Sequence, residues 1–249
     1  MKTKAKNKKY WEFKNQTADS ADLYLYIEIA SWGGGYAAHS AQSFKDELDA
    51  LGEISTLNVY INSPGGDVFE GSAIYNMLKR YNAQVNVHVD GIAASISSVI
   101  AMAGDNIIMP SNTMMMIHNA WTYTQGNADE LRKAADTLDK VNKSLMQAYL
   151  DKAGDKLNEE DLKTLMDNTS WLTAQECLDY GLCDVVGEAV SISACADAEL
   201  FTQYKNIPKE LLNSIKPKNT KSSDEEVKTL IARVNNTLKY EEARINENE

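Results

Sequence analysis

The sequence predicts an α/β fold, and three observations lead to that prediction. Short segments carry apolar residues at every second position, which is the period of a half-buried strand. Longer segments carry them three and four positions apart, which is the period of an amphipathic helix. The two kinds of segment alternate along the chain, with glycine-rich turns between them. Of the 249 residues, 43% are hydrophobic, which is enough for the full core of one domain.

The first predicted unit consists of a strand, a loop and a helix. Residues 22–30 (DLYLYIEIA) alternate as a strand, and a Trp-Gly-Gly-Gly loop follows at 32–35. An amphipathic helix is predicted over 37–51. Its apolar face is formed by Phe44, Leu48 and Leu51. His39, near the start of this helix, is interpreted as a polar surface residue.

A glycine turn follows the second predicted strand. Residues 57–62 alternate as a strand, Ser63-Pro64-Gly65-Gly66 ends it, and a helix is predicted over 68–80. Glycines after a proline reach positive φ and leave their N–H groups uncovered by side chains. Such a turn between a strand and a helix can aim an N–H group at an oxyanion. The alternative is an ordinary connecting turn, which is the commoner case for this motif alone.

Ser95 lies at the next turn of the same type. Residues 85–90 alternate as a strand, GIAA forms a tight turn at 91–94, and an apolar helix is predicted to follow. A hydroxyl in the first turn of a helix meets the positive end of the helix dipole, which favours the charge of an attacked carbonyl. Ser95 is therefore a candidate nucleophile, and the alternative is an N-cap serine. Ser97 and Ser98 are interpreted as small packing residues.

A histidine ends the short apolar strand predicted over 112–119. His118 lies near Trp121, and a histidine in such a place is more often structural than catalytic when it is considered alone. Ser95, His118 and the glycine turn, however, all follow successive strands, and open α/β sheets place their sites at the carboxyl ends of strands. Histidine has a pKa suited to taking a proton from a serine hydroxyl near neutrality. The sequence therefore predicts a serine–histidine pair beside an oxyanion turn.

The elements after this strand are mainly helical. Asn127 caps a long helix that is predicted to run to about Lys152, with apolar residues three and four positions apart. A short helix begins at 158–161, and Thr173-Ala174-Gln175-Glu176 has the pattern of a capping box on the next one. A last strand is predicted over 182–186.

The chain is predicted to have one folded domain between two terminal segments. A lysine-rich arm over residues 1–15, predicted to be mobile, lacks the hydrophobic segment of a secretory signal. The domain covers 16–192. The tail over 193–249 contains a polar linker at 216–223 and an amphipathic helix predicted over 224–244. This tail is a candidate for self-cleavage or for binding an assembly partner.

Composition argues against several functions. A net charge of −11 and a pI near 4.8 argue against nucleic-acid binding. No apolar run is long enough to span a bilayer. Cys177, Cys183 and Cys195 form no framework of pairs, which suits a reducing compartment. The three histidines are scattered, so neither a metal nor another cofactor is expected.

Four motifs together resemble those of the ClpP serine peptidases. They are YINSPGG at 60–66, GIAAS at 91–95, MIH at 116–118 and YGLCD at 180–184. The flanking segments resemble one branch of that family, the ClpP-like head-maturation (prohead) proteases of tailed phages and prophages. These flanks are WGGG at 32–35, DVFEG at 67–71, IYNML at 74–78 and AMAGD at 101–105. The resemblance covers roughly residues 10–190.

The resemblance implies a fold, a chemistry and a set of partners. The fold is the ClpP/crotonase spiral of repeated ββα units, with a long protruding helix that meets another subunit of a ring-like homo-oligomer. Ser95 is the implied nucleophile and His118 its general base. The N–H groups of Gly66 or Gly65 and of Ile96 form the implied oxyanion hole. Capsid or scaffolding proteins are the implied substrates, in the cytoplasm of a bacterial host cell or within assembling proheads.

The sequence departs from the family pattern at the third member of the triad. The family carries Asp or Glu two residues before an aromatic that is here Trp171, and this position is Thr169. Either Asp167, the nearest upstream carboxylate, reaches His118, or Thr169 or a water orients the ring more weakly. Asp167 could instead only support the end of a short helix. The missing acid leaves open a non-catalytic assembly protein, and a crotonase-type acyl-CoA enzyme, which does not require the Ser95–His118 pair, is the third alternative.

Overall fold

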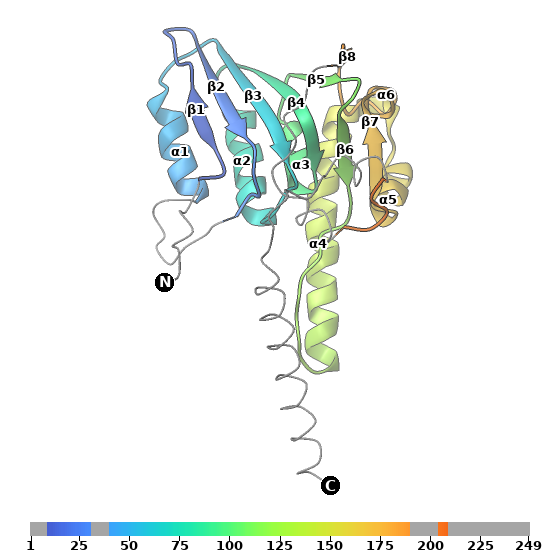
Figure 1. The fold of residues 1–249 in the computed structure, drawn as a ribbon. Helices are drawn as coiled ribbons and strands as arrows, with labels where there is room; N and C mark the ends of the chain where they lie inside the picture. The colour runs from blue at the N-terminus through green and yellow to red at the C-terminus, as the bar shows by residue number, and fades with distance from the viewer. Residues whose placement is uncertain (1–8, 31–39, 190–203, 209–249) are drawn as a thin grey trace, which may run out of the picture. The chain divides into compact units, whose positions relative to one another are not determined.

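The computed structural model describes residues 9–30, 40–189 and 204–208, which contain a central eight-stranded sheet (Figure 1). The strands are β1 (Glu12–Lys14), β2 (Ser20–Leu25), β3 (Thr56–Ser63), β4 (Gln84–Ala94), β5 (Asn106–Pro110), β6 (Met114–Ile117), β7 (Ser170–Thr173) and β8 (Val185–Gly187). Their order is β1-β2-β3-β4-β5-β8, and β6 joins β4 to β7. The helices are α1 (Ala41–Ala50), α2 (Val68–Arg80), α3 (Ile96–Ala101), α4 (Ala128–Ala153), α5 (Glu159–Asp167) and α6 (Ala174–Asp179), with a 3-10 turn at Gly154–Lys156. The predicted α/β class is therefore confirmed.

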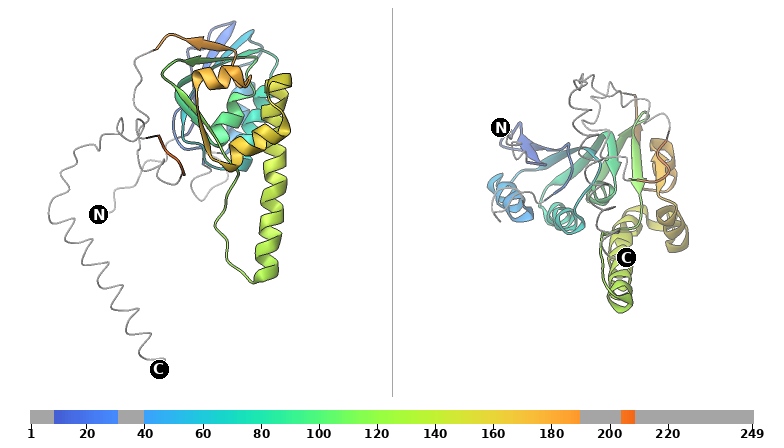
Figure 2. Two further views of the ribbon diagram at one scale, coloured as in Figure 1. Left: turned by 90° about the vertical axis from the view of Figure 1, so that its right-hand side faces the viewer. Right: turned by 60° about the horizontal axis from the view of Figure 1, so that its bottom comes forward.

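The sheet buries one face and leaves the other partly open. Leu23, Val59 and Val87 are neighbours across β2, β3 and β4 and are fully buried. The next positions along the same strands, Tyr24, Tyr60 and His88, are half-buried and stack their rings in a row. Figure 2 shows α1, α2 and α4 on one face of the sheet, as expected when helices connect parallel strands.

Strand β4 is longer than the sequence predicts. It continues to Ala94, so the prediction of a tight turn at 91–94 is wrong. The physical reason is backbone pairing: Ala93 pairs with Ser63 of β3, and the last three residues of β4 pair with β6 in parallel. This arrangement sets Ala94 opposite Met116 and so brings the ends of β4 and β6 together.

The N-terminal elements also differ from the prediction. Tyr10 and Trp11, placed by the sequence in a mobile arm, are each only 2% exposed, and β1 pairs antiparallel with β2. β2 ends at Leu25, and beyond it Ile29 makes a single bridge to Gly66. α1 begins after its N-cap Ser40. The first residues of the predicted helix and the whole helix predicted in the tail lie outside the described residues.

The long helix predicted after Asn127 is confirmed as α4, which has 26 residues. The Asn127 side chain accepts hydrogen bonds from the N–H groups of Asp129 and Glu130, as a cap should. Buried residues occur only in its C-terminal third: Leu145, Met146, Ala148, Tyr149 and Ala153. The N-terminal half extends away from the sheet (Figure 1).

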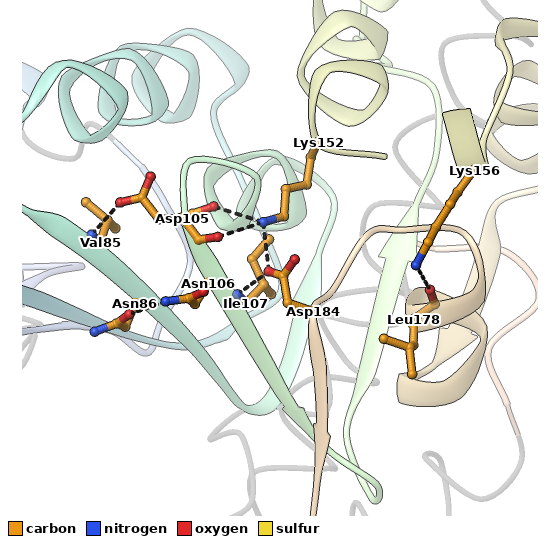
Figure 3. Close-up of polar contacts among 10 residues, drawn as sticks. Val85, Asn86, Asp105, Asn106, Ile107, Lys152, Lys156, Leu178 and Asp184 are labelled. Atoms are coloured by element: carbon orange, nitrogen blue, oxygen red, sulfur yellow. Dashed lines mark hydrogen bonds and ion pairs between the residues drawn. The ribbon is translucent and has the colours of Figure 1, made fainter. Parts of the chain in front are cut away.

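Lys152 connects the C-terminal end of α4 to the sheet through hydrogen bonds and an ion pair (Figure 3). Its ammonium group donates to the carbonyl oxygens of Gly104 and Asp105, at 3.2 and 3.1 Å, and forms an ion pair with Asp184 at 2.7 Å. The same Asp184 oxygen accepts the N–H of Ile107 at 2.7 Å. Because the Lys152 side chain is only 11% exposed, these contacts are poorly screened by water.

Candidate active site

Ser95 lies on a strained turn between β4 and α3. Its φ of 56° and ψ of −130° are rare for a residue with a Cβ, and such backbone costs on the order of 1–3 kcal/mol. The turn is fixed by the Ser95 N–H, which donates to the Met116 carbonyl at 2.8 Å, and by the Ser98 N–H, which donates to the Ser95 carbonyl at 2.9 Å. Ser95 occupies the N-cap position of α3, as the alternative interpretation predicts, but its hydroxyl makes no capping hydrogen bond.

His118 lies directly after β6 and reaches Ser95 with its ring. Nε2 of His118 is 2.8 Å from Oγ of Ser95. The pairing of Ala94 with Met116 explains the contact, since Ser95 follows Ala94 by one position and His118 follows Met116 by two. Burial of the half-buried ring lowers the pKa of His118 to about 4. The imidazole is therefore neutral near pH 7 and free to accept a proton.

The glycine turn lies against the nucleophile. A Cβ on Gly65 would lie 2.6 Å from the Cβ of Ser95, and a Cβ on Gly66 would lie 2.0 Å from the Ile29 carbonyl oxygen. The φ angles, +97° and +146°, also require glycine. Bonds from the Ile29 N–H to the Gly65 carbonyl and from the Asp67 N–H to the Ile29 carbonyl, at 2.7 and 2.6 Å, hold the turn.

The three predicted oxyanion donors differ in whether their N–H groups already donate a hydrogen bond. The Gly65 N–H donates to the Ser63 hydroxyl at 3.2 Å. Within the described ranges of the chain, the N–H groups of Gly66 and Ile96 have no hydrogen-bond acceptor. Ile96 is the first residue of α3, where the helix leaves such donors unpaired. Of the three predicted donors, Gly66 and Ile96 are thus the two whose N–H groups no described residue accepts.

The two candidates for the third triad position lie in different surroundings. Asp167 is exposed and accepts the Asn119 side-chain N–H at 2.7 Å and the Lys163 ammonium at 2.6 Å. These bonds, the one from Lys163 foremost, lower the pKa of Asp167. Thr169 is half-buried with a φ of +51°. Among the described residues, neither side chain hydrogen-bonds to the imidazole of His118.

A cavity of about 370 Å³ opens beside His118. It is lined by His118, Asn119, Ala120, Trp121, Tyr123, Met166, Asp167, Thr169, Tyr204 and Lys205. It therefore brings together His118, both candidates for the third position and two residues of the segment 204–208. Within residues 9–30, 40–189 and 204–208, no group of three His, Cys, Asp or Glu side chains could hold a metal ion.

Sequence reasoning missed two groups that touch the pair. The Ser98 hydroxyl, interpreted as packing, lies 2.5 Å from the Ser95 carbonyl, 3.2 Å from the Met116 carbonyl and 2.7 Å from the Tyr149 hydroxyl. Tyr204 contacts His118 edge-on, with ring centroids 5.2 Å apart. Ser98 and Tyr149 each occupy an ordinary core position of their helices, so the sequence pattern gives no sign that their hydroxyl groups meet. No local pattern distinguishes Tyr204.

These features together define a class of protein. A neutral imidazole lies on the hydroxyl of a serine held at a strained turn, next to two N–H groups for which the described residues offer no acceptor. This arrangement is typical of serine hydrolases. Residues 37–190, more than half of the chain, match the family model described as Clp protease.

Individual relatives agree with the family match. The chain is 39% identical over 140 residues to the ATP-dependent Clp protease proteolytic subunit of Ligilactobacillus salivarius (strain UCC118), covering 55% of this chain and 70% of the relative. It is 31% identical over 154 residues to the subunit of the same name from Bacteroides fragilis (strain ATCC 25285), covering 61% and 73%. The chain belongs to the Clp protease family and is a serine-type endopeptidase. None of its described helices is long and apolar enough to cross a membrane.

Proposed function

We propose that the chain cuts peptide bonds through an acyl-enzyme, with Ser95 as nucleophile and His118 as general base. The observation that carries the proposal is the 2.8 Å contact between Ser95 Oγ and Nε2 of a neutral His118. As Oγ attacks the scissile carbonyl carbon, its proton passes to Nε2, and the resulting imidazolium then donates that proton to the departing amine. Water, activated by the same nitrogen, hydrolyses the ester.

The proposed oxyanion hole consists of the N–H groups of Gly66 and Ile96. Gly65 serves a different purpose in this proposal: its own N–H is taken by Ser63, and its lack of a Cβ allows the turn to approach Ser95. Two donors aimed at the developing negative charge typically contribute a large share of the rate, because removing one costs about 10²–10³ in kcat.

We propose that Asp167 takes the role of the third triad member without contacting His118 directly. Asp167 holds the Asn119 side chain, and Asn119 is the residue that follows His118, so Asp167 would orient the base through the backbone. Thr169, which lines the same cavity as His118, is the direct alternative. Asp167→Asn and Thr169→Val separate them by the labelling rate of Ser95. If Asp167→Asn labels normally and Thr169→Val labels slowly, the indirect role of Asp167 is wrong.

For the biological setting, we propose cleavage of capsid or scaffolding proteins during phage head maturation, in the cytoplasm of a bacterial host or within proheads. Support comes from the flanking motifs at 67–71 and 101–105. Co-expression with the major capsid protein, followed by mass analysis of its N-terminus, tests this. An uncleaved capsid protein beside an active enzyme would contradict it.

We also propose a ring-like homo-oligomer built on the ClpP spiral of ββα units. Family membership supports it, and so does α4, whose N-terminal half carries the 44%-exposed Leu131 away from the sheet. Sedimentation at working concentration tests the assembly. A monomer would count against it.

The second candidate function is a non-catalytic assembly protein with the same fold. The absence of a carboxylate on His118 among the described residues favours it. A fluorophosphonate probe and intact-mass analysis decide between the two. We expect one adduct, mapped to Ser95, absent from Ser95→Ala and unchanged in Ser111→Ala, an exposed serine directly after β5. A folded, assembled sample without any adduct would favour the assembly protein.

A further inference from the structure

The short tail segment over residues 204–208 packs against the proposed catalytic pair. Tyr204 is only 8% exposed and belongs to an apolar cluster with Ile92, Ala94 and Met116. These are residues from the ends of β4 and β6, the two strands that carry Ser95 and His118. This segment thus covers the junction of these strands although it is remote from them in sequence.

Tyr204 makes two contacts that link different parts of the site. Its ring lies edge-on to the His118 imidazole, with centroids 5.2 Å apart and an angle of 81°. Its hydroxyl donates to the Pro64 carbonyl at 2.6 Å, across 140 residues of sequence. Pro64 directly precedes the two glycines of the turn. The Tyr204 side chain therefore contacts both His118, the proposed general base, and Pro64, the residue before the glycines of the proposed oxyanion turn.

Neighbouring residues fix the position of Tyr204. The Trp171 indole N–H donates to the Lys205 carbonyl at 3.0 Å, and the Asn206 side-chain N–H donates to the Asn168 carbonyl at 2.8 Å. The Trp171 ring also lies 6.4 Å from that of Tyr204. The segment is therefore attached to β7 by the Lys205 carbonyl and the Tyr204 ring, and to the turn before β7 by the Asn206 side chain.

We propose that Tyr204 is a positioning residue of this active site. Its ring holds the His118 imidazole in line with the Ser95 hydroxyl, and its own hydroxyl anchors the Pro64–Gly66 turn. The proposal rests on the function proposed above for Ser95 and His118. It supplies what the described residues otherwise lack, because no side chain among them hydrogen-bonds to the second nitrogen of His118. The aromatic ring of Tyr204 restricts the His118 imidazole by packing, whereas a carboxylate would restrict it by a hydrogen bond.

The pKa of His118 is a quantity that should change if Tyr204 positions the imidazole, and should not change if Tyr204 only stabilises the fold. Burial lowers the pKa of His118 to about 4, and the Tyr204 ring is part of what buries it. Removing that ring admits water and moves the pKa upward, toward the ordinary value of 6.5. The charged or titratable side chains that share the cavity, Tyr123, Asp167 and Lys205, all remain in the variant.

The first test compares Tyr204→Ala, Tyr204→Phe and Ile207→Ala with the wild type by the rate of fluorophosphonate labelling at Ser95. A misplaced base typically costs about 10- to 100-fold, so we expect a loss of that order for Tyr204→Ala at neutral pH. Tyr204→Phe keeps the ring and should retain most of the rate. Ile207→Ala, in the same segment and packed on the same cluster, is the matched control and should label normally.

The second test is independent of catalysis. NMR titration of His118, assigned with His118→Gln, should give a higher pKa in Tyr204→Ala than in the wild type or in Ile207→Ala. An unchanged His118 pKa overturns the proposal. So does a Tyr204→Ala protein that labels as fast as the wild type or faster, and a faster rate would identify the segment as an inhibitory cover. Wild-type labelling elsewhere than at Ser95 would instead refute the function proposed for the pair.

Discussion

Lowering the pH from about 7.5 to about 5.5 tests whether His118 acts as a buried base. With a pKa of about 4, the imidazole is still about 97% neutral at pH 5.5, whereas an exposed imidazole with a pKa of 6.5 would be about 9% neutral. The rate of a step that needs the neutral ring should therefore barely fall. A solvated base would lose roughly tenfold over the same interval.

The assay is the second-order rate of fluorophosphonate labelling at Ser95, measured from neutral pH down to the acid limit of folding. This rate reports the pKa of the free enzyme. His118→Gln provides the control, since its residual labelling should show no titration in this range. A wild-type midpoint near 6.5 would refute the argument, because it would mean that the ring is solvated.

The same pKa predicts the sign of a stability change. Between pH 6.5 and about 4, the unfolded chain binds a proton at His118 that the folded chain does not bind. Folding stability should therefore fall as the pH falls through this window, by up to about 3 kcal/mol in total for a 2.5-unit shift. Urea denaturation at several pH values measures it, and His118→Gln should weaken the dependence. An equal pH dependence in both proteins would contradict the burial argument.

Three further substitutions test the surroundings of the pair. Gly65→Ala puts a Cβ 2.6 Å from that of the proposed nucleophile and should reduce labelling by about 100-fold or more, whereas Gly52→Ala, which also has positive φ but open space, should reduce only stability. Tyr149→Phe removes the partner of the Ser98 hydroxyl and should cost about 1–2 kcal/mol in urea denaturation, with a smaller loss of labelling rate than Gly65→Ala. Lys152→Met removes an ion pair and two carbonyl contacts, and should cost about 1–3 kcal/mol without changing labelling per folded molecule. Normal labelling in the first variant, or unchanged stability in either of the others, would contradict these arguments.

The proximity of Ser95 and His118 could be predicted from the sequence for a physical reason. Both lie near the carboxyl ends of predicted strands, and parallel strands end at the same edge of a sheet. The register then needed only to bring Ala94 opposite Met116, which it does. The glycine turn was predictable in the same way, since a positive φ without a Cβ leaves Gly65 and Gly66 as almost the only residue type allowed.

Other contacts depend on side chains that no local pattern brings together. The strand β4 extends through residues 91–94 because two neighbouring strands pair with it, and a single sequence contains no record of that pairing. Asp167 meets Asn119 across 48 positions, and Tyr204 meets Pro64 across 140. The proximity of Ser95 and His118 was thus predictable from the sequence, whereas the contacts around them were not, because those contacts are made by packing between distant segments.

Thr169 offers a way to test how much that packed support contributes. A β-branched residue at a φ of +51° is strained, while Asp tolerates this region better, so Thr169→Asp should not destabilise the turn. Thr169 lines the cavity beside His118, and the resemblance to the ClpP peptidases puts an acid at this position. A carboxylate there would accept the second ring N–H, raise the pKa of His118 and favour the imidazolium formed during attack.

We therefore expect Thr169→Asp to label Ser95 faster than the wild type at neutral pH, by about tenfold or more, since losing the acid of such a triad can cost about 10⁴. Thr169→Asn is the matched control, because it has the same shape and the same tolerance of positive φ but no charge. Equal rates for the two variants would show that charge at this position is irrelevant. The orientation of His118 would then rest on the packing of its ring rather than on a missing acid.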